Sequence, residues 1–249
     1  MNREKNIARF EAEMEKVQRP GVDKLMAYIR KSDFYKAPAS TKYHLSCEGG
    51  LLQHSLNVLD AMRGILTHEP DEKDPQGRMK LKYHYTVADR FVTTAPEESV
   101  IIAALLHDIC KTYFYTTSWR NAKNEETGKW EKVPYYSVDD KMPLGHGPKS
   151  AMIIKQYMEL TTEEMYAIWW HMGYCDTQDT LSLGQAIDQY PLIWALHTAD
   201  MMASHFMEAE KGNRPMFEDP EQAEAPATDP EESAGEWADA PALEGGAYA

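Results

Sequence analysis

Six side chains that are good metal ligands are spread over the first 200 residues of this 249-residue chain. Several lie in strongly apolar segments such as LLQHSLNVL, AALLHDIC and AIWWHMG, where an unpaired imidazole or carboxylate is costly to bury. A divalent cation would compensate for that cost, because it binds both neutral imidazole and ionised carboxylate. The six residues are His54, His107, Asp108, His146, His171 and Asp200.

The adjacent pair His107 and Asp108 is the most informative part of this set. Asp108 follows the apolar run VIIAALL, where an unpaired carboxylate would cost several kcal/mol. A carboxylate near a helix end can bridge two ions while its neighbouring imidazole binds one of them. Lys111 follows one helical turn after Asp108, so its ammonium can face the same cavity and contact a phosphate oxygen. Each histidine alone is more often a hydrogen-bonded core residue, whereas six donors together favour a shared site.

The elements that must position these residues are mainly helices. Apolar spacing and end signals predict helices over residues 2–18, 22–30, 51–68, 97–111, 149–158, 162–171 and 192–209, with Thr162 as a cap. Residues 112–138 alternate aromatic and polar side chains around NAKNEETGK, which predicts a β-hairpin. The polar run EPDEKDPQGRMK at 69–80 is interpreted as an exposed loop or insertion. The predicted fold is mostly α.

The charge balance places limits on the partners of the chain. Its formal net charge is −14, of which the twelve acidic and two basic residues of 208–249 contribute −10. The net acidity argues against a broad basic surface for nucleic acid. After residue 211 the sequence is rich in Ala, Pro, Glu and Asp, which predicts a disordered acidic tail. Three unpaired cysteines and the lack of any apolar run of about 20 residues predict a cytoplasmic protein that does not enter a membrane.

The order H…HD…H…H…D, with HDICK where HDxGK is common, resembles the HD-domain superfamily of metal-dependent phosphohydrolases. The resemblance covers about residues 33–206, through the words FYKAPASTKYH, GGLLQHS, LLHDICK, LGHG and HTADMMA. These words are similar to the branch that holds the catalytic module of a bacterial 3'-to-5' exoribonuclease and many phage and bacterial HD hydrolases. The resemblance implies an HD-domain helical bundle at 32–210. Combined with the patterns above, it predicts a small β-hairpin insertion in this bundle, N-terminal helices at 1–31 that pack on it, and a disordered tail at 211–249.

The resemblance also assigns roles to individual residues. It implies that His54, His107, Asp108 and Asp200 form a four-ligand set, and that His146 and His171 belong to members with two metal ions. Asp108 would bridge the ions, and Asp108 and Lys111 are the catalytic candidates. Cys110 stands where glycine is usual. Two divalent ions (Mn, Fe, Ni, Zn or Mg) about 3.5 to 4 Å apart would activate a water that attacks the phosphorus atom.

Three further residues are candidates for binding the substrate, besides Lys111. His44 follows the loop PAS, from which it could contact the substrate. Lys149 follows a glycine and a proline at a predicted helix start, where free N–H groups favour a second phosphate. Arg120 lies on the predicted hairpin with Trp119 and Trp130, which could grip a backbone and stack a base; a solvated hairpin is the alternative.

The sequence therefore predicts a divalent-metal-dependent phosphohydrolase that uses metal-activated water on a nucleotide or a short oligonucleotide. The lack of excess positive charge favours small substrates, because a long polyanion gains most of its affinity from counterion release. Two alternatives remain: a 3'-to-5' exonuclease on RNA or single-stranded DNA, and a non-catalytic metal-binding interaction protein. Lys111 argues against the second of these, since a closed structural site needs no cation beside its metals.

Overall fold

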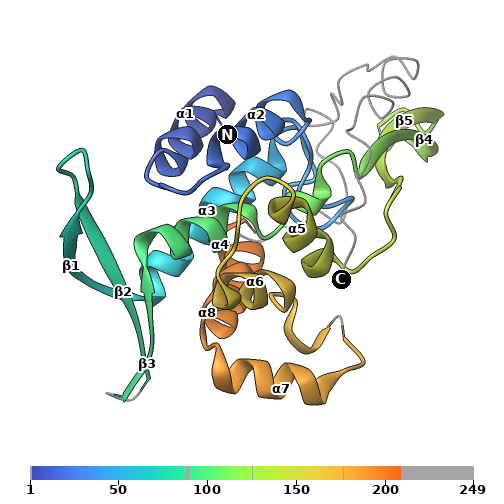
Figure 1. Cartoon of the computed structure of the whole chain (residues 1–249). Helices are drawn as coiled ribbons and strands as arrows, with labels where there is room; N and C mark the ends of the chain where they lie inside the picture. Colours follow the sequence, from blue (N-terminus) through green and yellow to red (C-terminus); the bar gives the residue numbers. More distant parts are fainter. Residues whose placement is uncertain (1, 88–89, 125, 176, 209–249) are drawn as a thin grey trace, which may run out of the picture.

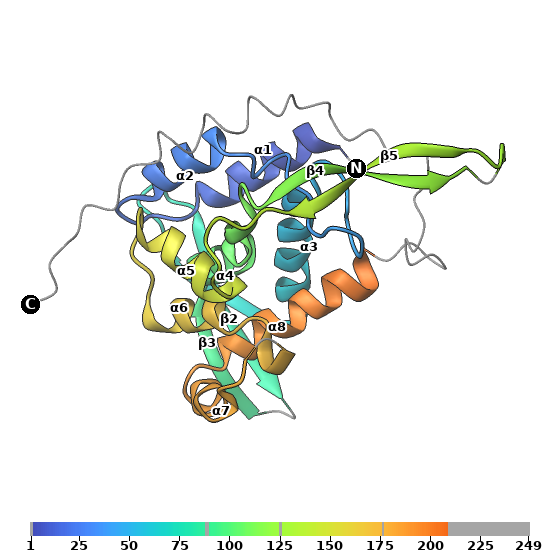
Figure 2. The same cartoon turned by 90° about the vertical axis from the view of Figure 1, so that its right-hand side faces the viewer.

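A single apolar helix forms the centre of this computed structural model, which describes residues 2–87, 90–124, 126–175 and 177–208. This helix is α4 (Glu97–Leu106), and it lies among the other helices in both Figure 1 and Figure 2. Every residue from 100 to 106 is fully buried. A helix that is apolar on all sides needs such surroundings. The predicted central helix is confirmed, but it ends before the His107–Asp108 pair.

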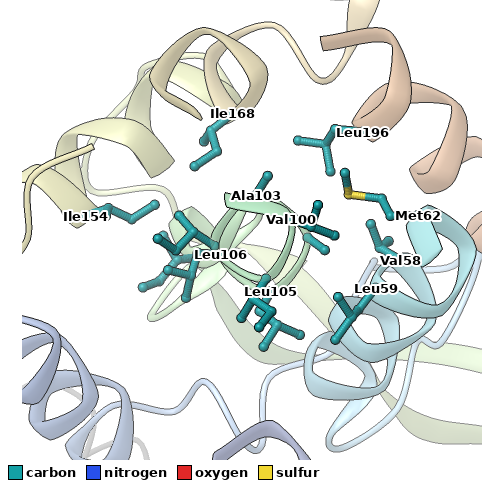
Figure 3. Close-up of a cluster of buried hydrophobic side chains, with 14 of the residues drawn as sticks. Val58, Leu59, Met62, Val100, Ala103, Leu105, Leu106, Ile154, Ile168 and Leu196 are labelled. Carbon is teal, nitrogen blue, oxygen red and sulfur yellow. The ribbon is translucent and has the colours of Figure 1, made fainter. Parts of the chain in front are cut away.

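Four helices lie around α4, namely α3 (Gly50–Ile65), α5 (His146–Lys155), α6 (Thr162–Trp169) and α8 (Leu192–Met202). Figure 3 shows the side chains that these helices contribute to the cluster around α4, among them Val58, Leu59, Met62, Ile154, Ile168 and Leu196. Gly147 allows α5 to approach α6 closely, because a Cβ there would lie 2.0 Å from the Trp169 carbonyl oxygen. Helix α5 begins three residues before its predicted start at residue 149, and α8 continues into a π-helical turn (Ala203–Met207).

Helices α1 (Arg3–Met14) and α2 (Val22–Lys31) pack on the same hydrophobic core. Two arginines form bidentate ion pairs that link this N-terminal part to α3 and α6. Arg63 of α3 donates to both oxygens of Glu13 at 2.7 Å, and Arg19 donates to both oxygens of the fully buried Glu164 of α6. Glu164 also completes a capping box with Thr161, so the cap of α6 is one residue earlier than predicted.

A three-stranded antiparallel sheet occupies the segment where the sequence predicted an exposed loop at 69–80. It consists of β1 (Thr67–Lys73), β2 (Met79–Val87) and β3 (Arg90–Pro96), in that order. Asp74 accepts the N–H of Arg78 at 2.7 Å and closes the turn between β1 and β2. The alternation of apolar and polar residues in β2, LKYHYTV, is the signal that the sequence analysis missed.

The second sheet is the predicted β-hairpin, formed by β4 (Tyr115–Lys123) and β5 (Trp130–Val138). It extends away from the helices as an arm in Figure 2, and Figure 1 places the two sheets at opposite ends of the helical body. Helix α7 (Thr180–Gln189) was not predicted; it packs through Leu183 and Ala186 against Ile193 in a small separate cluster.

The prediction of a mostly α bundle with one small hairpin is wrong. About 49% of the structure is helix and 18% is strand, with eight α-helices and two small sheets in the described part of the chain, so the fold is mixed α and β. The error has a physical cause: β1 is exposed along its whole length, and its charged residues give it the composition of a loop. The predicted tail at 211–249 lies outside the described residues. No helix in the described ranges is long and apolar enough to cross a membrane.

Candidate metal centre

The carboxylate of Asp108 is the meeting point of imidazoles from three different elements. Its Oδ2 lies 3.4 Å from His107 Nε2 and 3.7 Å from His54 Nε2, and its Oδ1 lies 3.8 Å from His171 Nε2. Asp200 joins the cluster through its Oδ1, 3.1 Å from His54 Nε2. Donor atoms that share one ion at about 2.0 to 2.2 Å are themselves about 3 to 3.6 Å apart, so these separations are close to those of a ligand set. The structure thus brings together five of the six predicted ligands directly.

Helix ends position two of these imidazoles. His107 directly follows α4 and His171 lies two residues after α6. Each ring uses its Nδ1 on a carbonyl of the preceding turn, Ala104 at 2.9 Å and Ile168 at 2.7 Å. A carbonyl can only accept, so Nδ1 carries a proton, the last turn of each helix gains a donor, and Nε2 is the nitrogen that faces Asp108. His54 projects from the second turn of α3, and Asp200 projects from the second half of α8.

The Nε2 atoms of His107 and His171 are buried and have no hydrogen-bond partner. Leaving a buried polar atom without a partner costs about 1 to 3 kcal/mol, and a cation bound to Nε2 would remove that cost. The donor set of imidazoles and carboxylates fits Mn, Fe, Ni or Zn, and fits Mg less well. The residues present therefore fit a divalent metal.

Protonation states also suit a cation. Burial, together with the neighbouring His107, lowers the pKa of His171 to about 4, so this ring is neutral at pH 7. Burial would raise the pKa of Asp108, but Lys111 and His107 hold it well below its usual value, and the carboxylate is ionised. Burial would lower the pKa of His54, but hydrogen bonds to Asp200 and Glu208 raise it to about 10. The proton on His54 thus balances carboxylates that a metal ion would otherwise balance.

Glu208 is a site residue that the sequence analysis missed, because it was counted with the acidic tail. Its Oε1 accepts from His54 Nδ1 at 2.9 Å and from Asn57 Nδ2 at 3.0 Å, while its Oε2 is 2.5 Å from His44 Nδ1. A carboxylate behind a ligand histidine fixes the ring and leaves Nε2 for the ion. The available signal was the spacing of eight residues from Asp200, two helical turns along the same face.

Two predicted substrate residues lie at the cluster. The ring of His44 packs against the ring of His54 at 4.8 Å between centroids, and its side chain is 19% exposed. The buried ammonium of Lys111 lies 2.7 Å from Asp108 Oδ2 and donates to the Ala39 carbonyl, also at 2.7 Å. Burial would lower the pKa of Lys111, but Asp108 raises it above its usual value, so the ammonium is charged.

His146, the first residue of α5, joins Asp108 through a second group. Its Nδ1 lies 3.7 Å from the sulfur of Cys110, and the donor atoms of Asp108, Cys110 and His146 all lie within 4.8 Å of one another. The sixth predicted ligand therefore approaches the same carboxylate as the others, with a cysteine beside it.

The other two predicted substrate residues are engaged elsewhere. Lys149 Nζ lies 2.5 Å from Asp140 Oδ1 and above the ring of Phe114, and the helix starts at His146 rather than at Lys149. The predicted phosphate site at that helix start is therefore not formed by this ammonium. Arg120 lies on the projecting hairpin, with its guanidinium above the ring of Tyr135.

Comparisons with known proteins gave no match: no family model matches the chain, no curated protein matches it, and no solved structure matches it. The resemblance to HD-domain phosphohydrolases therefore stays a prediction that depends on the quoted motifs.

Proposed function

We propose that this protein is a divalent-metal-dependent phosphohydrolase of the HD-domain type that acts on a nucleotide or a short oligonucleotide. One observation carries the proposal: two buried Nε2 atoms without hydrogen-bond partners, those of His107 and His171, face the ionised carboxylate of Asp108 from the ends of two helices. Imidazoles gathered around a buried, ionised carboxylate are an arrangement expected of a metal centre.

When bound, a pair of divalent cations would supply an activated water and neutralise charge on the phosphoryl oxygens. The chain's own residues prepare for this chemistry. The two oxygens of Asp108 face different histidines, so one carboxylate can serve two ligand sets. Lys111 holds a positive charge against Asp108, where it can attract a phosphate oxygen. Glu208 keeps His54 in the tautomer whose Nε2 faces Asp200.

The test measures the release of phosphate or nucleotide in the presence of Mn²⁺. The panel of substrates consists of nucleoside mono-, di- and triphosphates and short oligonucleotides. Asp108→Asn keeps the shape of the side chain but removes its charge, and we expect a loss of activity of about a hundredfold or more. Asp60→Asn is the matched control, because Asp60 pairs with Arg9 at the surface. If the natural chain binds its metal fully but turns over no member of the panel, the non-catalytic metal-binding alternative replaces this proposal.

A second candidate, a 3'-to-5' exonuclease, is favoured by one face of the hairpin. The register pairs Trp119 with Pro134 and Lys123 with Trp130, so these side chains share a face with Lys132. We call this face, made of Trp119, Asn121, Lys123, Trp130 and Lys132, the tryptophan face. Its two tryptophans are 64% and 72% exposed. Exposed aromatic rings beside lysines are typical of surfaces that bind single-stranded nucleic acid.

The tryptophan face begins close to the metal centre. Tyr115 is on the same side of the hairpin, and its hydroxyl donates to the Ala39 carbonyl at 3.2 Å, the oxygen that also accepts from Lys111. Nine residues of strand span about 30 Å, so a strand bound along this arm would end near Asp108. Shortening of an oligonucleotide from its 3' end, with mononucleotides left intact, would favour this candidate over the first.

A further inference from the structure

Cys110 is the donor in the metal centre that neither composition nor the motif resemblance assigns. Its sulfur is completely buried and lies 3.7 Å from His146 Nδ1, in the group that shares Asp108. The residue stands where glycine is usual in the HDxGK pattern, and glycine has no side chain to offer. The HDxGK pattern therefore does not account for a thiol at this position.

The distance between the two donor atoms is informative. A zinc ion binds sulfur at about 2.3 Å and an imidazole nitrogen at about 2.0 to 2.1 Å, so a tetrahedral ion places the two donors about 3.6 Å apart. The separation of 3.7 Å between Cys110 Sγ and His146 Nδ1 is close to this value. A weak S–H···N hydrogen bond has a similar length, but only a metal–thiolate bond would give a charge-transfer band with Co²⁺.

Packing holds the two donors together. The N–H of Cys110 donates to the hydroxyl of Ser150 at 3.2 Å, and Ser150 is fully buried one helical turn after His146 on α5. This bond anchors the 3₁₀ turn (Ile109–Lys111) on α5 beside His146. Sulfur and imidazole are thus positioned by the same helix.

The buried ring of His171 also points to a ligand at Asp108. The His171 side chain is 1% exposed, its Nε2 has no hydrogen-bond partner, and that atom faces Asp108 Oδ1 at 3.8 Å. A cation would pair this buried acceptor, and Asp108 is common to its group and to the group of Cys110.

We propose that Cys110 is a thiolate ligand of the second metal ion, together with Asp108 and His146, and that it makes this position selective for Zn²⁺ or Fe²⁺ over Mg²⁺ and Mn²⁺. The inference rests on the proposed metal centre. Soft thiolate donors favour zinc and iron, whereas magnesium and manganese favour oxygen donors. When the metal–sulfur bond forms, the thiol proton passes to the solvent, and no atom is oxidised or reduced.

The first test leaves Cys110 untouched. In the variant Cys47→Ser/Cys175→Ser of the full chain, Cys110 is the only cysteine. Loaded with Co²⁺, this variant should show the near-ultraviolet absorption of thiolate-to-cobalt charge transfer at the intensity of the natural chain. A reagent that labels thiols should modify Cys110 in the unfolded, metal-free variant, which confirms that the thiol is intact.

The second test exchanges the donor. Cys110→Ser and Cys110→Gly, checked for folding by circular dichroism, should lose the charge-transfer band. In competition between Zn²⁺ and Mn²⁺, the preference of the second ion for zinc should fall about tenfold or more. Cys47→Ser is the matched control, and it should keep both the band and the preference.

The role of Cys110 and the existence of the metal centre are contradicted by different results. Two bound Co²⁺ ions without a thiolate band in the single-cysteine variant would overturn the role of Cys110 and leave the metal centre in place. Failure of the natural chain to bind any of these ions would overturn the metal centre itself, and the proposed function with it.

Discussion

In the proposed metal centre, Glu208 would act through His54, as a positioning residue rather than a ligand. Its carboxylate accepts from His54 Nδ1, and His44 and Asn57 hold it in place. We expect Glu208→Gln to weaken Mn²⁺ binding about 10- to 100-fold, because an amide fixes the tautomer of His54 less firmly. Isothermal titration calorimetry measures the change.

A merely structural role of Glu208 would give a different result. Glu159→Gln, at an exposed position on the loop before α6, is the control and should bind Mn²⁺ like the natural chain. If Glu208→Gln lowers the melting temperature but leaves the Mn²⁺ affinity unchanged, Glu208 stabilises the fold without orienting His54.

The clustering of the candidate ligands was predictable from the sequence because polar side chains in apolar segments need a partner whatever the fold. A histidine and an aspartate after VIIAALL are buried in almost any packing, and they need a partner there. Glu208 was not predictable in the same way, because it lies among acidic residues and its partner, His54, is 154 residues away. The engagement of Lys149 with Asp140 was equally hidden, since a lysine at a helix start gives no sign of its ion-pair partner.

At the level of elements, the two sheets show which signals a sequence carries. The hairpin β4–β5 was predictable because aromatic residues alternate on both sides of a turn-rich segment. The sheet β1–β2–β3 was missed because its first strand is exposed and charged, so it lacks an apolar face. The short helix α7 packs only a small cluster on the main body, and its apolar pattern is correspondingly weak.

The packing of α1 on α3 is predicted to depend on pH through Glu13. Burial would raise the pKa of Glu13, but the hydrogen bonds from Arg63 and Lys16 lower it to about 2. In the unfolded chain the pKa is about 4.3, so the ion pair stabilises the fold fully above that pH and loses its effect as the pH falls through about 2. Glu13→Gln should therefore lower the free energy of unfolding by about 2 kcal/mol at pH 7 and by little at pH 2.

Urea unfolding at several pH values measures this difference. Glu4→Gln, at an exposed position of the same helix, serves as the control and should change stability little. A destabilisation by Glu13→Gln that is equal at pH 7 and pH 2 would show that packing, and not the charge of Glu13, holds α1 in place.

The tryptophan face is predicted to bind an oligonucleotide substrate but not a mononucleotide. Trp119→Ala/Trp130→Ala should raise the KM for a single-stranded oligonucleotide about tenfold or more, because base stacking on an aromatic ring contributes about 1 to 3 kcal/mol per base. The turnover of a mononucleotide should not change, because both residues lie on the projecting arm. Equal effects on both substrates would show that the arm supports the fold near the site.

For the molecule as a whole, the distribution of charge sets the expected choice of substrate. Residues 211–249 contain ten acidic and two basic residues, and they follow closely after Glu208, which contacts His54. A chain that ends at residue 210 should therefore cleave oligonucleotides with a several-fold lower KM at low salt. The advantage should vanish at about 1 M salt, where the screening length is about 3 Å. Measured KM values that are the same for both chains at low salt would contradict this prediction.

The same truncation should leave the metal centre intact. All the residues that meet around Asp108 precede residue 209, so the stoichiometry of bound Mn²⁺ and the turnover of a mononucleotide should match those of the full chain.

The ring N–H groups of His107 and His171 fill the open carbonyl positions at the ends of α4 and α6, while the opposite nitrogen of each ring faces Asp108. Each imidazole therefore stabilises the end of its helix whether or not the site binds a metal ion or a substrate. A related chain without the proposed activity would still be selected to keep both histidines, because their loss would fray the two helices. Retention of these two histidines in a related chain would thus say little about activity, whereas retention of His54 and Asp200 would say much more.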